Sequence, residues 1–178
     1  PEALEVEPID TEPPVITITQ PEARDYLRPE QLSVQVSAQD TESGVLILQT
    51  ALGTTTVPNI GEIDLFFLPL GFHTLISSSI DYVGNATTSQ RTIRVIATAS
   101  STISDIEKAY QLGWMVLSVR DKLVSKLETY IEKIEQSKRA EKFILKDILN
   151  ELERRRGKEL NEQAYQLLRE DINWLINN

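Results

Sequence analysis

The chain contains no cysteine, one histidine and one methionine among its 178 residues. The lack of cysteine excludes disulfide bonds, thiolate nucleophiles and cysteine-ligated zinc, and a single histidine leaves little material for a transition-metal site. No apolar run approaches the ~20 residues that a membrane-spanning helix needs, so we expect no transmembrane segment. The formal net charge of −9 disfavours nucleic acids and anionic membrane surfaces as partners.

Catalytic motifs are also lacking: the sequence has no Walker loop, Rossmann glycine pattern, HExxH, zinc-ligand spacing or nucleophile elbow. His73 stands at the start of a predicted strand without a serine–histidine–aspartate order around it, which favours a structural role. The Arg154–Arg156 run ends a predicted helix among acidic neighbours, which favours a solvated helix end over an anion or nucleic-acid site. We predict that the chain is not an enzyme and that, calcium excepted, it carries no cofactor.

Lysine is absent from residues 1–100, which excludes a lysine-based isopeptide crosslink there. This half holds thirteen acidic side chains against four arginines, whereas residues 101–178 hold fourteen of each sign. All eight prolines and five of the seven glycines lie in the first half, and the second is rich in helix formers. The composition predicts two domains, all-β and then all-α, with an acidic leader or linker at 1–12, the domains at 13–98 and 102–178, and a short link at 98–102.

The first half contains short β-favouring runs between turn signals. The clearest one alternates strictly, with Leu32, Val34, Val36 and Ala38 on one face. Seven such runs at spacings of 8–12 residues predict an immunoglobulin-like β-sandwich; they cover 15–19, 32–38, 45–50, 54–57, 63–68, 73–80 and 92–97. Because residues 63–68 are mostly apolar, we expect Phe66 and Phe67 to lie in a buried strand rather than in an exposed sugar platform.

The second half has helical periodicity. A capping-box pattern at Ser104–Glu107 predicts a helix that ends at Gly113, and further helices are expected over about 119–134 and 139–156. Asn161 is the expected N-cap of a fourth helix. Stripes of apolar residues, with Leu127 and Ile148 among them and Phe143 on the same face as Ile148, predict the core of a small antiparallel helical bundle.

Four segments of the first half resemble bacterial Ig-like repeats in order and spacing: DTEPPVI (10–16), AQDTESGV (38–45), GFHTL (71–75) and DYVGN (81–85). The resemblance covers roughly 10–98. It implies an extracellular module, usually a spacer, stalk or adhesin repeat, and does not specify a ligand.

The second half resembles the FIMAH domain, a helical module at the C-terminal ends of secreted and surface bacterial proteins. The resemblance covers about 102–177, and its matching residues are Gly113, Leu123, Lys126, Leu127, Ile148, Leu149, Leu152, Gly157, Lys158, Leu160, Ala164 and Leu168. Nearly all of these are predicted core or cap residues, so the resemblance implies a fold and not a site.

The two resemblances together imply a non-catalytic extracellular or cell-surface module pair with a spacer, adhesion or interaction role in a larger bacterial protein. The alternative is an accessory glycan- or protein-binding module of a secreted enzyme whose catalytic domain lies outside this sequence. Expected partners are upstream domains of the same chain and a surface glycan or protein. Since the sequence begins at Pro1 and lacks a signal-peptide pattern, we interpret it as a fragment.

Acidic residues in two loops suggest a calcium site. In a seven-strand sandwich, the loop after the second strand, with Asp40 and Glu42, and the loop before the last strand, with Asp81 and Asn85, lie at the same pole. The first strand begins there too, which brings Asp10 and Glu12 nearby. Calcium prefers six to eight oxygen ligands. The alternative is that these residues only form turns, for which Asp and Asn are well suited.

Overall fold

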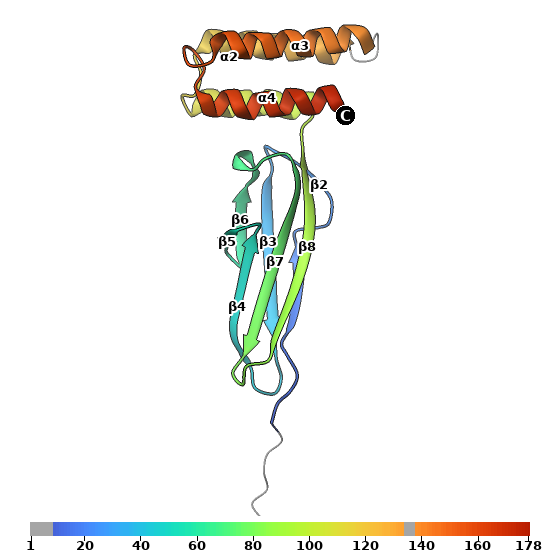
Figure 1. The fold of residues 1–178 in the computed structure, drawn as a ribbon, viewed down its shortest axis with the longest axis vertical. Helices are drawn as coiled ribbons and strands as arrows, with labels where there is room; N and C mark the ends of the chain where they lie inside the picture. The colour runs from blue at the N-terminus through green and yellow to red at the C-terminus, as the bar shows by residue number, and fades with distance from the viewer. Residues whose placement is uncertain (1–8, 134–137) are drawn as a thin grey trace, which may run out of the picture. The chain divides into compact units, whose positions relative to one another are not determined.

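The computed structural model describes residues 9–133 and 138–178. Strands precede helices along the chain, as predicted. One sheet has the order β1-β3-β6 and the other the order β2-β8-β7-β4-β5 (Figure 1). The strands are β1 (Val15–Gln20), β2 (Asp25–Leu27), β3 (Gln31–Gln39), β4 (Val45–Leu52), β5 (Thr55–Val57), β6 (Ile60–Asp64), β7 (Gly71–Asp81) and β8 (Ala86–Ile96).

The alternation in β3 places its side chains as predicted. Leu32, Val34 and Val36 are at most 2% exposed, while the serine and glutamine residues between them face solvent. β1 pairs antiparallel with β3, so that Ile18 lies opposite Val36. β2 was not predicted, because three residues between turn signals carry too little periodicity to identify a strand.

Residues 63–68 do not form the predicted buried strand. β6 ends at Asp64, and Leu65–Phe67 form a 3₁₀ helix. The Asp64 side chain accepts a hydrogen bond from the Phe66 N–H at 3.0 Å and so begins this short helix. Phe66 is fully buried, but Phe67 is 61% exposed, because a 3₁₀ turn does not alternate its side chains as a strand does.

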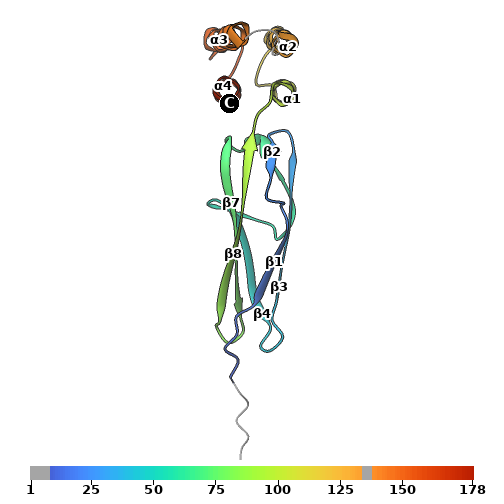
Figure 2. The same cartoon turned by 90° about the vertical axis from the view of Figure 1, so that its right-hand side faces the viewer.

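Four helices follow: α1 (Ala99–Gln111), α2 (Leu117–Lys133), α3 (Lys138–Arg155) and α4 (Glu162–Asn177). α1 packs on α2, α2 on α3, α3 on α4, and α4 on α1, and Figure 2 shows the four from their ends. Leu127 and Ile148 are at most 1% exposed, as predicted. Phe143, by contrast, is 75% exposed, and Leu145 takes the core position on that turn.

The start of α1 differs from the prediction. Thr98 is the N-cap: its side chain accepts a hydrogen bond from the Ser101 N–H at 3.1 Å, and its own N–H donates to Ser101 Oγ at 2.8 Å. The helix therefore begins at Ala99, and residues 99–102 form its first turn instead of a link. The capping box therefore uses Ser101 at the third helical position. The Ser104–Glu107 pattern would have placed a glutamate at that position.

The predicted helix ends are confirmed at Gly113 and Gly157, which have φ of 72° and 71°. After α1, the Gly113 N–H donates to the Tyr110 carbonyl and the Trp114 N–H donates to the Ala109 carbonyl, both at 2.9 Å. This Schellman arrangement needs a left-handed residue, which glycine adopts without a steric cost.

The chain divides into two compact units, and neither is continuous in sequence. The first contains Pro1–Arg24, Leu32–Ile63 and His73–Ile93, and the second contains Asp25–Gln31, Asp64–Phe72 and Arg94–Asn178. The helices thus share a unit with two separate segments of the β-rich half and with the end of β8, and Phe66 belongs to the same buried cluster as the helix core. Independent folding of residues 13–98 and 102–178 is a separate property and stays a prediction. No helix within the described ranges is long and apolar enough to cross a membrane.

Candidate functional site

Asp40 and Asp81 each organise a loop of the first unit. Asp40 follows β3, and its Oδ1 accepts hydrogen bonds from the N–H groups of residues 42–44 at 2.8–3.1 Å. Asp81 ends β7, and its Oδ1 accepts hydrogen bonds from the N–H groups of residues 83–85 at 2.6–2.9 Å. These are the side-chain-to-backbone turns expected if the acidic residues form turns, which was the alternative to a calcium site in the sequence analysis. In each loop a turn therefore fixes the carboxylate.

The segment before β1 is attached to both loops through Asp10. Its Oδ2 accepts a hydrogen bond from the Ser43 N–H at 3.1 Å, and its Oδ1 accepts one from the Glu12 N–H at 2.9 Å. From the other loop, Asn85 Nδ2 donates to the Asp10 carbonyl at 3.2 Å. The entry to β1 is thus tied by hydrogen bonds to the loops after β3 and after β7.

These contacts bring three carboxylates together. Asp10, Asp40 and Asp81 each offer one oxygen, and the three oxygens lie within 4.8 Å of one another. Asp81 is fully buried and Asp10 is 9% exposed. Hydrogen bonds, the Ser43 contact foremost, lower the pKa of Asp10. Burial by itself would raise the pKa of Asp81, but the bonds from Asn85 and the turn N–H groups outweigh it and lower the pKa. Both groups are therefore held ionised.

Of the four residues predicted to bind calcium, the structure brings Asp40 and Asp81 together, and Asp10, which was expected nearby, joins them. Glu42 lies outside this trio and is exposed, and the negative charge of Asp10 is the main cause that raises its pKa. Asn85 directs its amide nitrogen toward the cluster, where it donates to Asp81 Oδ2 at 2.7 Å. Glu12 contributes a carbonyl that accepts a hydrogen bond from the same nitrogen at 3.4 Å. Asn85 is thus a hydrogen-bond donor to Asp81.

The trio offers hard oxygen atoms of the kind that calcium prefers. The turns use Oδ1 of Asp40 and of Asp81, and Oδ2 of Asp81 accepts a hydrogen bond from Asn85. Within the described residues, no lysine or arginine forms an ion pair with these three carboxylates. A divalent cation would offset their mutual repulsion.

A second polar cluster is buried in the second unit and was not predicted. Arg28, which lies just after β2, is 1% exposed. Its Nη1 is 2.8 Å from Asp171 Oδ1 and 3.2 Å from the Leu167 carbonyl, and its Nη2 forms an ion pair with Glu170. Glu170 also accepts a hydrogen bond from the Leu70 N–H at 3.0 Å. Contacts from α4 therefore hold the segments 25–31 and 64–72 of this unit.

Asp105 of α1 completes this cluster. Asp105 and Asp171 are fully buried, and their side chains contact each other. Burial raises the pKa of Asp105 to about 7, although Arg28 opposes the shift. Burial also raises the pKa of Asp171 well above its usual value, again against Arg28. Lys108, Asp64 and Glu170 are the other charged groups that act on the pair. Two carboxyls that share one arginine retain a proton between them near neutral pH.

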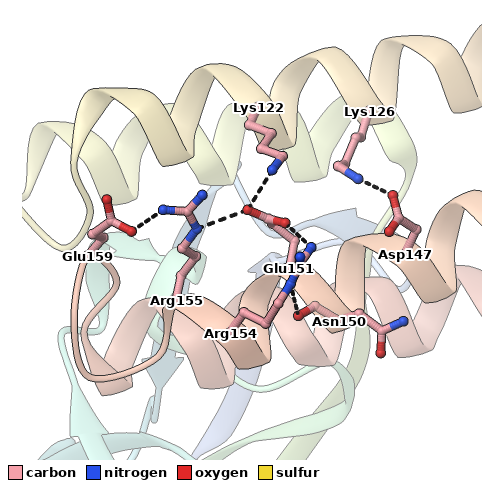
Figure 3. Close-up of polar contacts among 8 residues, drawn as sticks. All are labelled: Lys122, Lys126, Asp147, Asn150, Glu151, Arg154, Arg155 and Glu159. Carbon is pink, nitrogen blue, oxygen red and sulfur yellow. Dashed lines mark hydrogen bonds and ion pairs between the residues drawn. The ribbon is translucent and has the colours of Figure 1, made fainter.

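The Arg154–Arg156 run is neutralised, as predicted. Glu151 is 1% exposed and forms ion pairs with Arg154 and Arg155 of its own helix, α3, the latter through Nε at 3.0 Å. Lys122 of α2 also lies 3.0 Å from Glu151 through its Nζ, and Figure 3 shows these contacts. Burial would raise the pKa of Glu151, but the bonds from Lys122 and Arg155 outweigh it and lower the pKa. The remaining arginine, Arg156, pairs with Glu162. Each arginine of this run is therefore paired with a glutamate.

The missed residues had a recognisable signal. Asp105 stands next to Ile106, and Asp171 next to Ile172, each in register with the apolar stripe of its helix. A charged residue on a core face needs a buried partner. Arg28 is one of only four cations in the first hundred residues. Arg28, however, lies more than 70 residues from these two aspartates, and only the folded structure shows that it pairs with them.

No family model, no curated protein and no solved structure matches this chain.

Proposed function

We propose that the chain is a non-catalytic, extracellular or cell-surface module pair of a larger bacterial protein, with a spacer or adhesion role. In this proposal an Ig-like β-sandwich at 13–98 precedes an antiparallel helical bundle at 102–178, and upstream domains of the same protein are its partners. The strand order supports the first part. The order β8-β7-β4-β5 corresponds to G-F-C-C′ of Ig sandwiches, and β1-β3-β6 corresponds to A-B-E.

The observation that carries the spacer role is the fixed entry to β1. A spacer must transmit a defined direction to the residues that precede it. Asp10 is bound to the loop after β3 through Ser43 and to the loop after β7 through Asn85. The entry segment thus has hydrogen bonds on two sides before the first strand begins.

We further propose that calcium stabilises this entry through Asp10, Asp40 and Asp81. The three carboxylates repel one another, and a cation that binds them would join the entry segment to both loops. Calcium sites of extracellular modules have dissociation constants of about 10⁻⁴–10⁻³ M. Such a site is filled where calcium is millimolar, which suits a protein outside the cell.

Thermal unfolding in calcium tests the proposal. At 10 mM CaCl₂ we expect a melting temperature about 3–11 °C higher than in EDTA, as ligand linkage predicts for this affinity range. Asp10→Asn should abolish the calcium-dependent rise, because it removes one charge from the cluster and keeps an oxygen to accept the Ser43 N–H.

Glu128→Gln is the matched control, since Glu128 is an exposed acid on α2. Its calcium-dependent rise should equal that of the wild type, and 10 mM MgCl₂ controls for ionic strength. Equal melting temperatures in calcium and in EDTA would contradict the calcium-stabilised spacer.

A further inference from the structure

One pocket of the second unit combines exposed aromatic rings with a row of polar side chains. Its volume is about 600 Å³, which is within the size range of small-ligand sites. One wall comes from the 3₁₀ helix and the residues that follow it, together with Trp114 from the α1–α2 connection. The opposite wall is one face of α4. All the lining residues belong to the second unit.

The aromatic wall combines one buried ring with one exposed ring. Phe66 is fully buried and anchors the cluster, with its ring centroid 5.2 Å from that of Phe67 and 5.6 Å from that of Trp114. The rings of Phe67 and Trp114 are 6.2 Å apart. Phe67 nevertheless remains 61% exposed, so its ring contributes little to the core. The planes of Phe67 and Trp114 are inclined by 68°, so a planar apolar face can stack on the exposed ring of Phe67 with Trp114 beside it.

The polar wall presents neutral amides. Gln163, Gln166 and Asn173 line the pocket at spacings of three and seven residues, which place them on one face of α4. Each amide offers donors and an acceptor. Glu170 is on the same face, but Arg28 and the Leu70 N–H already bind it. Arg169 lines the pocket as well, and the Gln166 amide also donates to Glu162 at 2.6 Å, so the groups left to recognise a ligand are three amides and one guanidinium.

We propose that this pocket binds a neutral oligosaccharide, with a sugar ring stacked on Phe67 beside Trp114 and its hydroxyls bonded to the amides of α4. A pyranose ring has an apolar C–H face and a rim of hydroxyls, and the pocket has one wall for each. A purely apolar ligand would leave the amides without partners.

The inference does not depend on the proposed spacer role, since the pocket and the carboxylate trio share no residue. It also reverses the expectation from sequence that Phe67 is buried. The proposed glycan partner therefore binds to the second unit and not to the β-sheets.

Titration calorimetry and tryptophan fluorescence with cello-, xylo-, manno-, laminari- and chitohexaose test the proposal. We expect at least one of these five sugars to bind with a dissociation constant at or below 1 mM. The Trp174→Phe variant leaves Trp114 as the only tryptophan, and its fluorescence should change on binding. Phe67→Ala should weaken binding at least tenfold, and Gln166→Ala at least threefold.

Phe143→Ala is the control, because Phe143 is also an exposed phenylalanine and does not line the pocket. It should bind the same sugar within twofold of the wild type, and equal melting temperatures would show that Phe67→Ala folds normally. Repeating the titration in EDTA separates the result from calcium binding, since sugar affinity should not change. The proposal is overturned if none of the five sugars binds at 5 mM. Equal losses in Phe67→Ala and Phe143→Ala, or binding of a neutral oligoproline peptide but no sugar, would overturn it too.

Discussion

Replacing Asp105 by asparagine should make the stability of the protein less sensitive to pH. Asp105 is fully buried against Asp171, and burial raises its pKa from 3.8 to about 7. Between these two values the folded state keeps a proton that the unfolded state releases. The free energy of unfolding of the wild type therefore falls as the pH rises through this window and levels off above pH 7. Asparagine does not titrate and still has an N–H₂ group to donate to Asp171.

The magnitude follows from the pKa difference. Each pKa unit corresponds to about 1.4 kcal/mol, so the full effect of Asp105 is roughly 4 kcal/mol. Between pH 5 and pH 8 only the part of the window above pH 5 is crossed, which leaves about 2–3 kcal/mol. We expect the unfolding free energy of Asp105→Asn, minus that of the wild type, to increase by this amount from pH 5 to pH 8.

The measurement is urea unfolding at several pH values, with the difference between the two proteins as the result. Taking the difference removes the contribution of carboxylates with lowered pKa, such as Asp10 and Glu151, which stabilise the fold as the pH rises through the acidic range. Asp121→Asn, on the exposed side of α2, should give a constant difference. If the difference for Asp105→Asn is also constant between pH 5 and pH 8, the buried pair does not hold a proton and the reasoning is wrong.

Other substitutions test the packing. Leu127→Ala should cost about 2–5 kcal/mol of unfolding free energy by chemical denaturation, whereas Phe143→Ala should stay within about 0.5 kcal/mol, and equal losses would contradict the burial of Leu127. Thr98→Ala should lower the free energy of unfolding by about 1 kcal/mol, because it removes the N-cap of α1, and Ser104→Ala should lower it less. If thermal melts show a larger loss for Ser104→Ala, the N-cap is Ser104, as the sequence predicted. Arg28→Met should cost about 3–5 kcal/mol because it leaves buried carboxyls without their cation, with a larger loss at pH 8 than at pH 5; a loss below 1 kcal/mol would show that the cation is dispensable.

Local signals in the sequence were sufficient for most elements. The strict alternation correctly predicted which face of β3 is buried. Glycines with positive φ end α1 and α3 where predicted. The predictions failed where two local patterns competed. At Ser104 a second capping box lay downstream of the one that is used, and at Phe67 an apolar run concealed a turn that Asp64 begins.

The candidate sites depended on contacts that no local pattern specifies. Asp40 and Asp81 were predicted to meet because loops at one pole of a sandwich do so, and Asp10 joined them through the entry segment. The Arg28 cluster and the aromatic pocket were missed, since both join β-derived segments to helices more than forty residues away. Periodicity reports which face of an element is buried, but not which distant side chain lies against it.

The burial of Arg28 imposes an order on events during synthesis. Its partner Glu170 follows 142 residues later in the chain. At roughly 5–20 residues per second, a ribosome needs on the order of 7–30 s to make that stretch. Throughout this interval the Arg28 guanidinium has no carboxylate of α4 to bind. Residues 25–31 therefore reach their final packing only when α4 has been made, and a nascent chain truncated before α4 never completes this step.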